Sequence, residues 1–174
     1  EAGTVEAIVN VCSGTDAAGL ARRQRAADAG AIAAAAAAMQ AHPQVAGLQE
    51  HGCAALRNVC AGDDAAGRAR SQRAADAGAI EVRRWAGAIE AVVAAMQAHP
   101  QVADVQYYGC SALGNVCFGT DAAGLARKQR AAAAGAIEAI RRWRRCRLTR
   151  RRRRCRGKGV GRCATCAPAP TPQG

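Results

Sequence analysis

The segment from Ala88 to Gly119 reads AIEAVVAAMQAHPQVADVQYYGCSALGNVCFG, and its pattern decides the fold. Its first part carries four apolar residues at positions i, i+3, i+4 and i+7, namely Ile89, Val92, Val93 and Met96. This spacing places them on one face of an α-helix. Alanine fills the neighbouring positions, and alanine is the residue that favours helix most strongly.

A second helix is predicted after His99 and Pro100. Proline lacks a backbone N–H and fits the first turn of a helix. We therefore expect the first helix to end at His99 and the next one to hold Pro100 in its first turn. This next helix would direct four apolar residues towards the interior, with two cysteines beside them: Val102, Val105, Leu113, Val116, Cys110 and Cys117.

The same strings recur along the chain. NVC occurs at Asn10–Cys12, Asn58–Cys60 and Asn115–Cys117, AMQAHPQVA at Ala38–Ala46 and Ala95–Ala103, and DAAG at Asp16, Asp64 and Asp121. The NVC strings are 48 and then 57 residues apart. The longer spacing coincides with a doubled AGAIE, at 77–81 and 86–90. A period of about 40 to 50 residues without a strand pattern indicates a helical solenoid.

Each unit also contains an earlier helix. It is predicted to begin after the N-cap pairs Thr15-Asp16, Asp63-Asp64 and Thr120-Asp121, and to end at Gly30, Gly78 and Gly135. The predicted fold is therefore all-α, a right-handed α-α superhelix with units at about 15–62, 63–119 and 120–140. Because no polar cap covers either end, we expect the end units to fray.

A short helix ending in AG, followed by AIEAVVAAMQ and PQVADVQYYGCSALGNVCFG, resembles the armadillo repeat. The resemblance covers nearly all of residues 15–140, or about two and a half repeats, and the ending ALxNVCxG is its most characteristic part. HEAT-type repeats are the second choice, since they normally have two helices per unit.

Two segments depart from the pattern. Residues 1–12 read as a truncated remnant, in which the start of a second helix runs directly into NVC. The doubled AGAIE would turn a continuous helix by half a turn, so that Ile80 and Ile89 could not both face the interior. Either the helix breaks near Gly87 or the segment Val82–Trp85 protrudes.

The resemblance also implies a binding surface. In armadillo proteins the third helices line a concave groove, and an asparagine near the end of each one commonly binds the backbone of an extended peptide. This implies partner-binding roles for Asn58 and Asn115, and we assign Arg57 and Ser111 to the same surface. The alternative is that the asparagines hydrogen-bond locally near a helix end. Ala54 and Ser111 stand where import receptors place tryptophan, which argues against recognition of basic import signals.

Basic residues recur on the first helix of each unit: Arg22, Arg23, Arg25, Arg70, Arg73, Arg127, Lys128 and Arg130. They could form a stripe for an acidic partner. We favour a solvated face balanced by Asp28 and Asp76. The cysteines of the third helices are expected to be small buried thiols. No second ligand accompanies His42 or His99 at metal-binding spacing.

The net charge of +12 is concentrated at the C-terminal end. Residues 1–140 carry 12 basic and 13 acidic side chains, a net charge of −1, whereas residues 141–174 carry 13 basic and no acidic ones. This tail allows three functional interpretations: a nuclear localisation signal, a nucleic-acid-binding arm at Arg141–Arg156, or a zinc site. The zinc site would use Cys146, Cys155, Cys163 and Cys166, but only one CxxC pair is present.

We favour a different interpretation of the tail. Read from the third base of each codon, residues 141–174 permit a gap-free sequence that ends in ALRNVCAGTDAAG, which closely matches Val92–Gly124. The tail is then an out-of-frame translation of a further repeat, and we expect it to be disordered or poorly packed.

The remaining features indicate a non-catalytic protein-interaction scaffold. No motif for phosphate binding, nucleophilic catalysis or paired acid–base chemistry is present, so we expect no enzyme activity, no cofactor and no small-molecule substrate. The expected partner is another protein or an extended peptide. No apolar run reaches membrane-spanning length. We expect a cytoplasmic protein, with a nuclear location as the alternative, and a fragment, because the chain begins at Glu1.

Overall fold

The computed structural model describes residues 2–76 and 87–145, and these residues form helices without any strand. The helices are α1 (Ala2–Val11), α2 (Ala17–Asp28), α3 (Ala31–Ala41), α4 (Ala46–Val59), α5 (Ala65–Asp76), α6 (Ala88–Ala98), α7 (Ala103–Val116) and α8 (Ala122–Ala133), followed by a helix over 136–145. The predicted all-α class is confirmed for this part of the chain. None of the described helices combines the length and apolar character that a membrane span requires. The tail beyond residue 145, with its four cysteines, lies outside the described residues.

The helix boundaries follow the capping signals. Oδ1 of Asp16 accepts a hydrogen bond from the backbone N–H of Gly19 at 2.8 Å, and Asp64 and Asp121 make the same contact in α5 and α8. Gly30, after α2, has a φ of 84°, the left-handed conformation that follows many helices. Gly135 takes this conformation after α8, whereas Gly78 lies outside the described residues.

The placement of Pro100 in the first turn of a helix is wrong. The backbone N–H of Val102 donates to the carbonyl of His99 at 3.2 Å, so the residues from His99 to Val102 form a turn, and α7 begins only at Ala103. Proline favours the second position of such turns because its φ is already fixed there. The chain makes the same turn from His42 to Val45, before α4.

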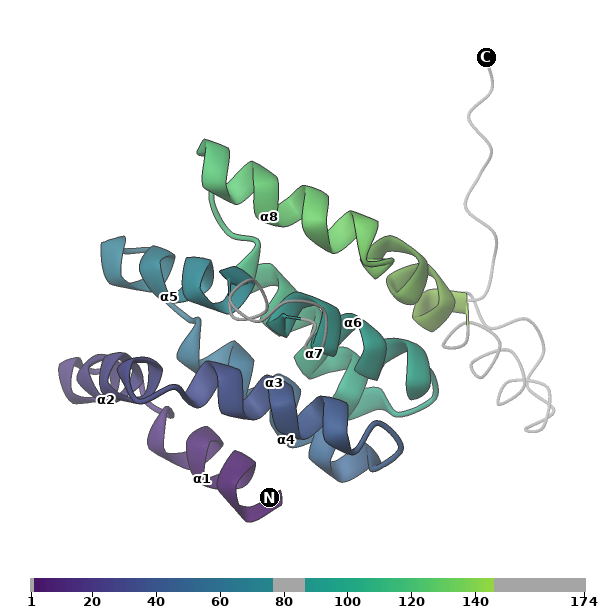
Figure 1. Cartoon of the computed structure of the whole chain (residues 1–174), viewed down its shortest axis with the longest axis horizontal. Helices are drawn as coiled ribbons and strands as arrows, with labels where there is room; N and C mark the ends of the chain where they lie inside the picture. Colours follow the sequence, from purple (N-terminus) through teal and green to yellow (C-terminus); the bar gives the residue numbers. More distant parts are fainter. Residues whose placement is uncertain (1, 77–86, 146–174) are drawn as a thin grey trace, which may run out of the picture.

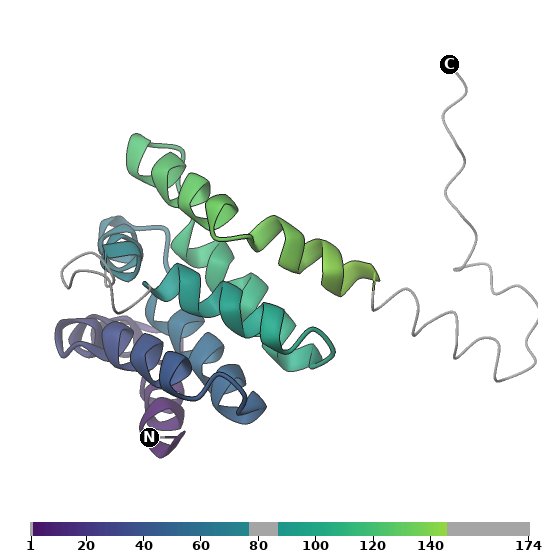
Figure 2. The same cartoon turned by 45° about the vertical axis from the view of Figure 1, so that its right-hand side comes forward.

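Corresponding helices of successive sequence units lie side by side (Figures 1 and 2). Helices α2, α5 and α8 form one set, α3 and α6 a second, and α1, α4 and α7 a third. Within the segment 1–12, which reads as a truncated remnant, the residues Ala2–Val11 form one helix, α1. It packs against α4 much as α4 packs against α7, with Val5 and Cys12 buried.

The helix break at Gly87 is one of the two arrangements expected for the doubled AGAIE. Gly87 is extended, and α6 begins at the next residue, so that Ile89 of the second copy is fully buried. A side chain on Gly87 would lie within 3.2 Å of Arg130, Glu90 and the carbonyl of Ala75. The segment Val82–Trp85 and Ile80 lie outside the described residues.

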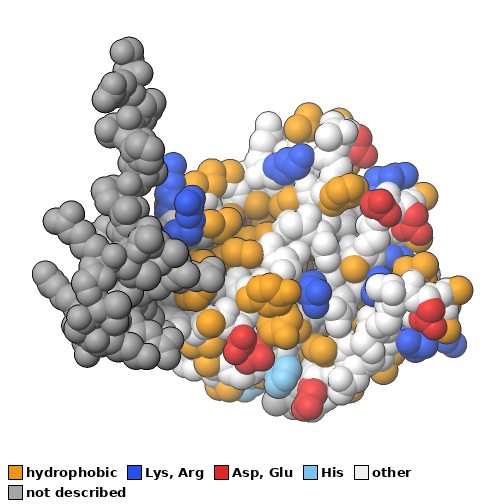
Figure 3. All heavy atoms as spheres, turned by 180° about the vertical axis from the view of Figure 1, so that it is seen from behind, with side chains coloured by type: hydrophobic (Ala, Val, Ile, Leu, Met, Phe, Trp, Pro, Cys, Tyr) orange, Lys and Arg blue, Asp and Glu red, His pale blue; other side chains and the backbone are white. Residues whose placement is uncertain are grey.

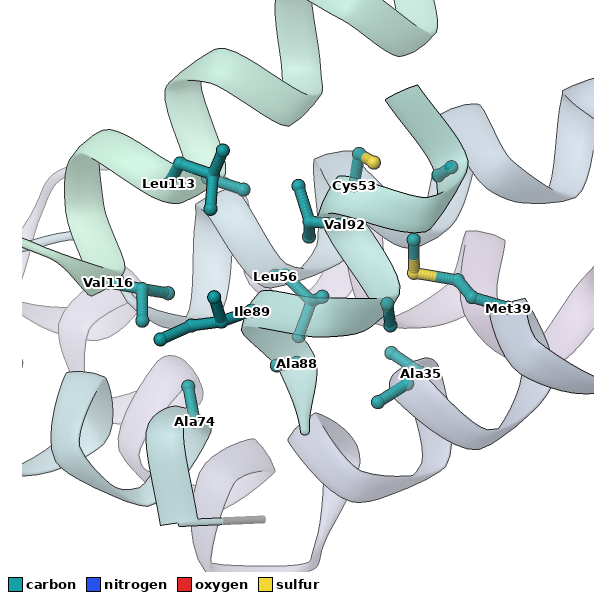
Figure 4. Packing of buried hydrophobic residues seen from close by; sticks show 14 of the residues in the cluster. Ala35, Met39, Cys53, Leu56, Ala74, Ala88, Ile89, Val92, Leu113 and Val116 are labelled. Carbon is teal, nitrogen blue, oxygen red and sulfur yellow. The ribbon is translucent and has the colours of Figure 1, made fainter. Parts of the chain in front are cut away.

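Small residues bring the helices close together in the core (Figure 4). All four residues of the α6 apolar face are buried, as predicted: Ile89, Val92, Val93 and Met96. Gly109 of α7 lies so close to Met96 that a Cβ there would be 2.7 Å from Cγ of the methionine. Gly52 and Met39 repeat this contact between α4 and α3. Because alanine and glycine contribute little buried area, polar contacts carry much of the specificity of the packing.

Three of the recurring arginines, Arg23, Arg70 and Arg127, are buried rather than part of a solvated face, and the last two make the same contacts. Arg70 is 1% exposed, and its Nε and Nη2 donate to the carbonyls of Val59 and Ala61 at 2.8 Å. Arg127, 3% exposed, repeats both contacts with Val116 and Phe118. Each guanidinium thus satisfies carbonyl groups at the C-terminal end of the preceding α4 or α7, which have no partner within the helix. The predicted solvated face is therefore wrong for these two residues and for Arg23, which is 7% exposed.

A glutamine links Arg70, and another links Arg127, to the preceding unit. Nη1 of Arg70 donates to Oε1 of Gln24 at 3.1 Å, and Nη1 of Arg127 donates to Oε1 of Gln72 at 2.6 Å. Arg22 occupies the same sequence position in α2 and binds the carbonyls of Val11 and Ser13, but it is only partly buried. Further out, Arg73 pairs with Asp28, in keeping with the charge balance expected there.

Arg70→Ala is expected to lower the free energy of unfolding by about 3 kcal/mol, because it leaves two buried carbonyls without a charged donor. Urea denaturation followed by circular dichroism measures this change. Arg22→Ala is the matched control, since the side chain makes the same backbone contacts at a more exposed site, and its cost should stay below about 1 kcal/mol. Equal losses in the two variants would contradict the stabilising role of Arg70.

The cysteines of α4 are buried thiols, as expected. Cys53 and Cys60 are fully buried and free, and their burial raises the pKa of each thiol to about 12. The neighbouring Cys110 adds slightly to the rise in the pKa of Cys53, and Arg70 partly opposes the rise in the pKa of Cys60. Both thiols therefore stay neutral in the folded protein at physiological pH.

These raised pKa values predict a loss of stability at high pH. An unfolded thiol ionises near the ordinary pKa of 9.0, whereas the folded thiols ionise only at about 12. The stability that these thiols contribute is complete below pH 9 and falls as the pH rises from 9 towards 12. Urea denaturation between pH 8 and pH 11 should show this fall. The variant Cys53→Ala with Cys60→Ala should show a shallower fall, and an unchanged slope would contradict the prediction.

Candidate functional site

A groove of about 690 Å³ runs across the C-terminal halves of α4 and α7. It is lined by Thr15, Leu20, Arg23, Arg57, Asn58, Ala61, Gly62, Ser111, Gly114 and Asn115. The structure thus brings all four residues assigned to partner binding, Arg57, Asn58, Ser111 and Asn115, to one surface. They come together because α4 and α7 lie side by side with their NVC strings in register.

The two asparagines also hold neighbouring helices together. Nδ2 of Asn58 donates to the carbonyl of Val9 in α1 at 3.2 Å, and Nδ2 of Asn115 donates to the carbonyl of Arg57 in α4 at 2.8 Å. Hydrogen bonding near a helix end was the alternative to peptide binding. The bonds observed are not local, because they join residues that are 49 and 58 positions apart in sequence. Each uses one of the two donor hydrogens of the amide.

Arg57 and Ser111 lie beside the asparagines. The guanidinium carbon of Arg57 is 6.0 Å from the ring centroid of Tyr108, within the range of a cation–π contact. Oγ of Ser111 donates to the carbonyl of Tyr107, one turn earlier in the same helix, at 2.9 Å. Tyr107 and Tyr108 form an edge-to-face pair with centroids 5.2 Å apart, and Tyr107 is exposed. These contacts place a cation and an aromatic surface next to the amides.

The groove carries positive charge and no negative charge. Its lining includes two arginines and no carboxylate. Arg23 is buried, with its guanidinium bound to the carbonyls of Cys12 and Gly14, and burial lowers its pKa. Seen from behind Figure 1, the middle of the surface is made mainly of hydrophobic and uncharged groups, while acidic side chains lie towards the rim (Figure 3). The lining therefore suits a neutral or acidic ligand better than a basic one.

A second groove of about 660 Å³ repeats the first one unit further along the chain. Its lining includes Arg68, Gly114, Phe118 and Gly119, which correspond in the repeat to Leu20, Arg57, Ala61 and Gly62 of the first groove. Unlike the first groove, it also has a carboxylate in its lining, that of Asp121, together with Lys128. Gly114 lines both grooves and was not predicted as a site residue. The sequence did contain a signal for two other lining residues, Gly62 of the first groove and Gly119 of the second. Each lies two residues after an NVC string, as Gly14 does after the first NVC string.

The described residues bring no three histidine, cysteine, aspartate or glutamate side chains together at a position that could hold a metal ion. Nε2 of His99 lies 2.8 Å from the carbonyl of Pro43, so the recurring His-Pro turns contact each other between units. The first groove is lined by two asparagine amides, two arginines and two hydroxyl groups, and the second by two cations, the carboxylate of Asp121 and the ring of Phe118.

No protein-family model matches the chain, and no curated protein or solved structure shows significant similarity to it.

Asn115→Ala is expected to lower the free energy of unfolding by about 1 kcal/mol, because it removes the bond from α7 to α4. Ser111→Ala, in the same groove, should change it by less than about 0.5 kcal/mol, since the serine bonds only within its own helix. Urea denaturation separates the two variants. If Asn115→Ala proved as neutral as Ser111→Ala, the bond from α7 to α4 would contribute nothing measurable to stability.

Proposed function

We propose that this chain is an armadillo-like helical solenoid whose function is to bind another protein without catalysis. Two features support this proposal. Corresponding helices of successive sequence units pack side by side in three sets, and the sequence units carry the ALxNVCxG ending that is characteristic of the armadillo repeat. On this proposal α1, α4 and α7 are third helices, which line the binding surface.

The single observation that carries the proposal is the convergence of Arg57, Asn58, Ser111 and Asn115 on one groove. An extended peptide presents alternating N–H and carbonyl groups, and an asparagine amide can bind either kind. Asn58 and Asn115 each use one donor hydrogen for the contact to the neighbouring helix. Their second donor hydrogen and their carbonyl oxygen provide the capacity for a ligand.

The ligand proposed is an extended segment of neutral or acidic character. Arg57 supplies the more accessible charge, since Arg23 is buried against backbone carbonyls. Tyr108, beneath the guanidinium of Arg57, restricts the movement of that side chain. A carboxylate or a backbone carbonyl of the ligand would therefore meet a donor that is already oriented.

Gly114 provides a direct test, because it lines the groove and a side chain there would extend into open space. We expect Gly114→Trp to fill the groove while the fold persists, since replacing a helical glycine generally stabilises the helix. Peptides selected from a random library against the unmodified chain should bind Gly114→Trp at least about tenfold more weakly. Fluorescence anisotropy measures the affinities.

Gly47→Trp is the matched control. Gly47 also lies exposed in a helix with open space around its Cβ position, but it does not line the groove. Its affinities should equal those of the unmodified chain. Equal binding to both variants would exclude this groove. A different result is a peptide affinity that falls steeply as the salt concentration rises and that Gly114→Trp leaves unchanged. This result would indicate ionic binding through the basic tail.

A further inference from the structure

The outer face of α1 exposes residues whose counterparts are buried elsewhere in the chain. Val11 is 49% exposed, whereas Val59 and Val116 at the same repeat position are 0% and 2% exposed. Ala7 is exposed, although its counterparts Ala55 and Ala112 are fully buried. Asn10 is also exposed, at the position from which Asn58 and Asn115 reach the preceding helix. This face of α1 therefore carries the residues that, in α4 and α7, contact the corresponding helix of the preceding unit.

At the opposite end, α7 and α8 also expose residues whose counterparts are buried or hydrogen-bonded elsewhere in the chain. Cys110 and Cys117 are half-buried, whereas Cys53 and Cys60, which precede a further unit, are fully buried. Gln129 is exposed, although its counterparts Gln24 and Gln72 accept hydrogen bonds from the arginines of the following units. Four large apolar side chains are exposed here as well: Phe118, Leu125, Ile137 and Ile140.

The two end faces match in their hydrogen-bonding groups. Nδ2 of Asn115 donates to the carbonyl of Arg57, and by the repeat register the amide of Asn10 would meet the carbonyl of Gly114. Arg127 donates to Gln72, and Arg22 would likewise meet Gln129. The end at α1 thus offers donors at the two places where the end at α7 and α8 offers acceptors.

The two grooves give a further observation. Ser111, Gly114 and Asn115 line the first groove, and their counterparts in α1 are Glu6, Val9 and Asn10. The second groove includes the counterparts of Leu20, Arg57, Ala61 and Gly62, but its lining has no residue at those three positions of a further helix. A helix like α1, placed beside α7, would supply residues at these positions.

From this match we propose that the chain associates head to tail with a second copy of itself, with α1 of one copy docked on the face formed by α7, α8 and residues 136–145 of the other. Such a contact is heterologous, so it leaves one free end of each kind and can extend into longer chains of copies. The inference does not require that a peptide binds in the first groove, although Gly114 belongs both to that groove and to the end face.

Analytical ultracentrifugation of the full chain tests the proposal. The weight-average mass should rise with concentration beyond that of a dimer. Ala7→Arg places a long charged side chain on the docking face of α1 and should weaken self-association about tenfold or more. Fluorescently labelled Ala7→Arg should nevertheless co-sediment with the unmodified chain, because its other end remains intact. If the labelled variant neither self-associates nor joins the unmodified chain, the contact pairs like faces, and the head-to-tail arrangement is wrong.

Gln129 tests the opposite end through the sign of a charge. Gln129→Glu would face Arg22 of the next copy with an opposite charge and should tighten association about twofold to fivefold, whereas Gln129→Arg should weaken it by a similar factor. The same two substitutions at Gln44, which is exposed in a turn away from both end faces, control for net charge. A chain that stays monomeric at all concentrations, or equal effects of the two charges at Gln129, would overturn the proposal.

Discussion

The packing of this chain depends on the capping of helix C-terminal carbonyls by buried arginines. Helices α4 and α7 end in glycine-containing loops, and the last carbonyls of a helix have no partner within it. Arg70 and Arg127 supply these partners and reach the preceding unit through a glutamine with the same guanidinium group. One side chain therefore fixes both where α4 or α7 ends and where the neighbouring helices lie. Without it, buried carbonyls would be left unsatisfied at the junction of three helices.

This arrangement compensates for a core made largely of alanine. Close approach of the helices needs small residues, as the contacts of Gly52 with Met39 and of Gly109 with Met96 illustrate. Small side chains interlock little, so they do not select one register between two helices over another. The bonds of Gln49 to the carbonyls of Met39 and His42, and of Gln106 to those of Met96 and His99, supply that definition within each unit. The apolar residues thus stabilise the fold through the area that they bury, whereas other, polar residues determine how the helices are aligned.

The sequence predicted the helices well because their signals are local. The Asp16 cap, the Gly30 ending and the apolar face of α6 each depend on residues within a few positions. The role of the arginines could not be found in this way, since Arg70 appears polar and solvent-facing until α4 and α5 are placed together. Pro100 was misplaced because a proline before a helix fits a turn as readily as a first helical turn. The convergence of Asn58 and Asn115 followed from the repeat, but their bonds to neighbouring helices required knowledge of how the units stack.

The bonds between units also have a direction. Among the described residues, the arginine and asparagine side chains that bridge two sequence units donate from the later unit to the earlier one, as Asn58, Asn115, Arg70, Arg73 and Arg127 do. The direction is set by the face on which these side chains lie, and an arginine on that face can only donate, so its partner in the earlier unit must be an acceptor. A stack built from such contacts has a donor-rich face at one end and an acceptor-rich face at the other. Two like faces brought together would pair donors with donors, whereas unlike faces reproduce the junction already found inside the chain.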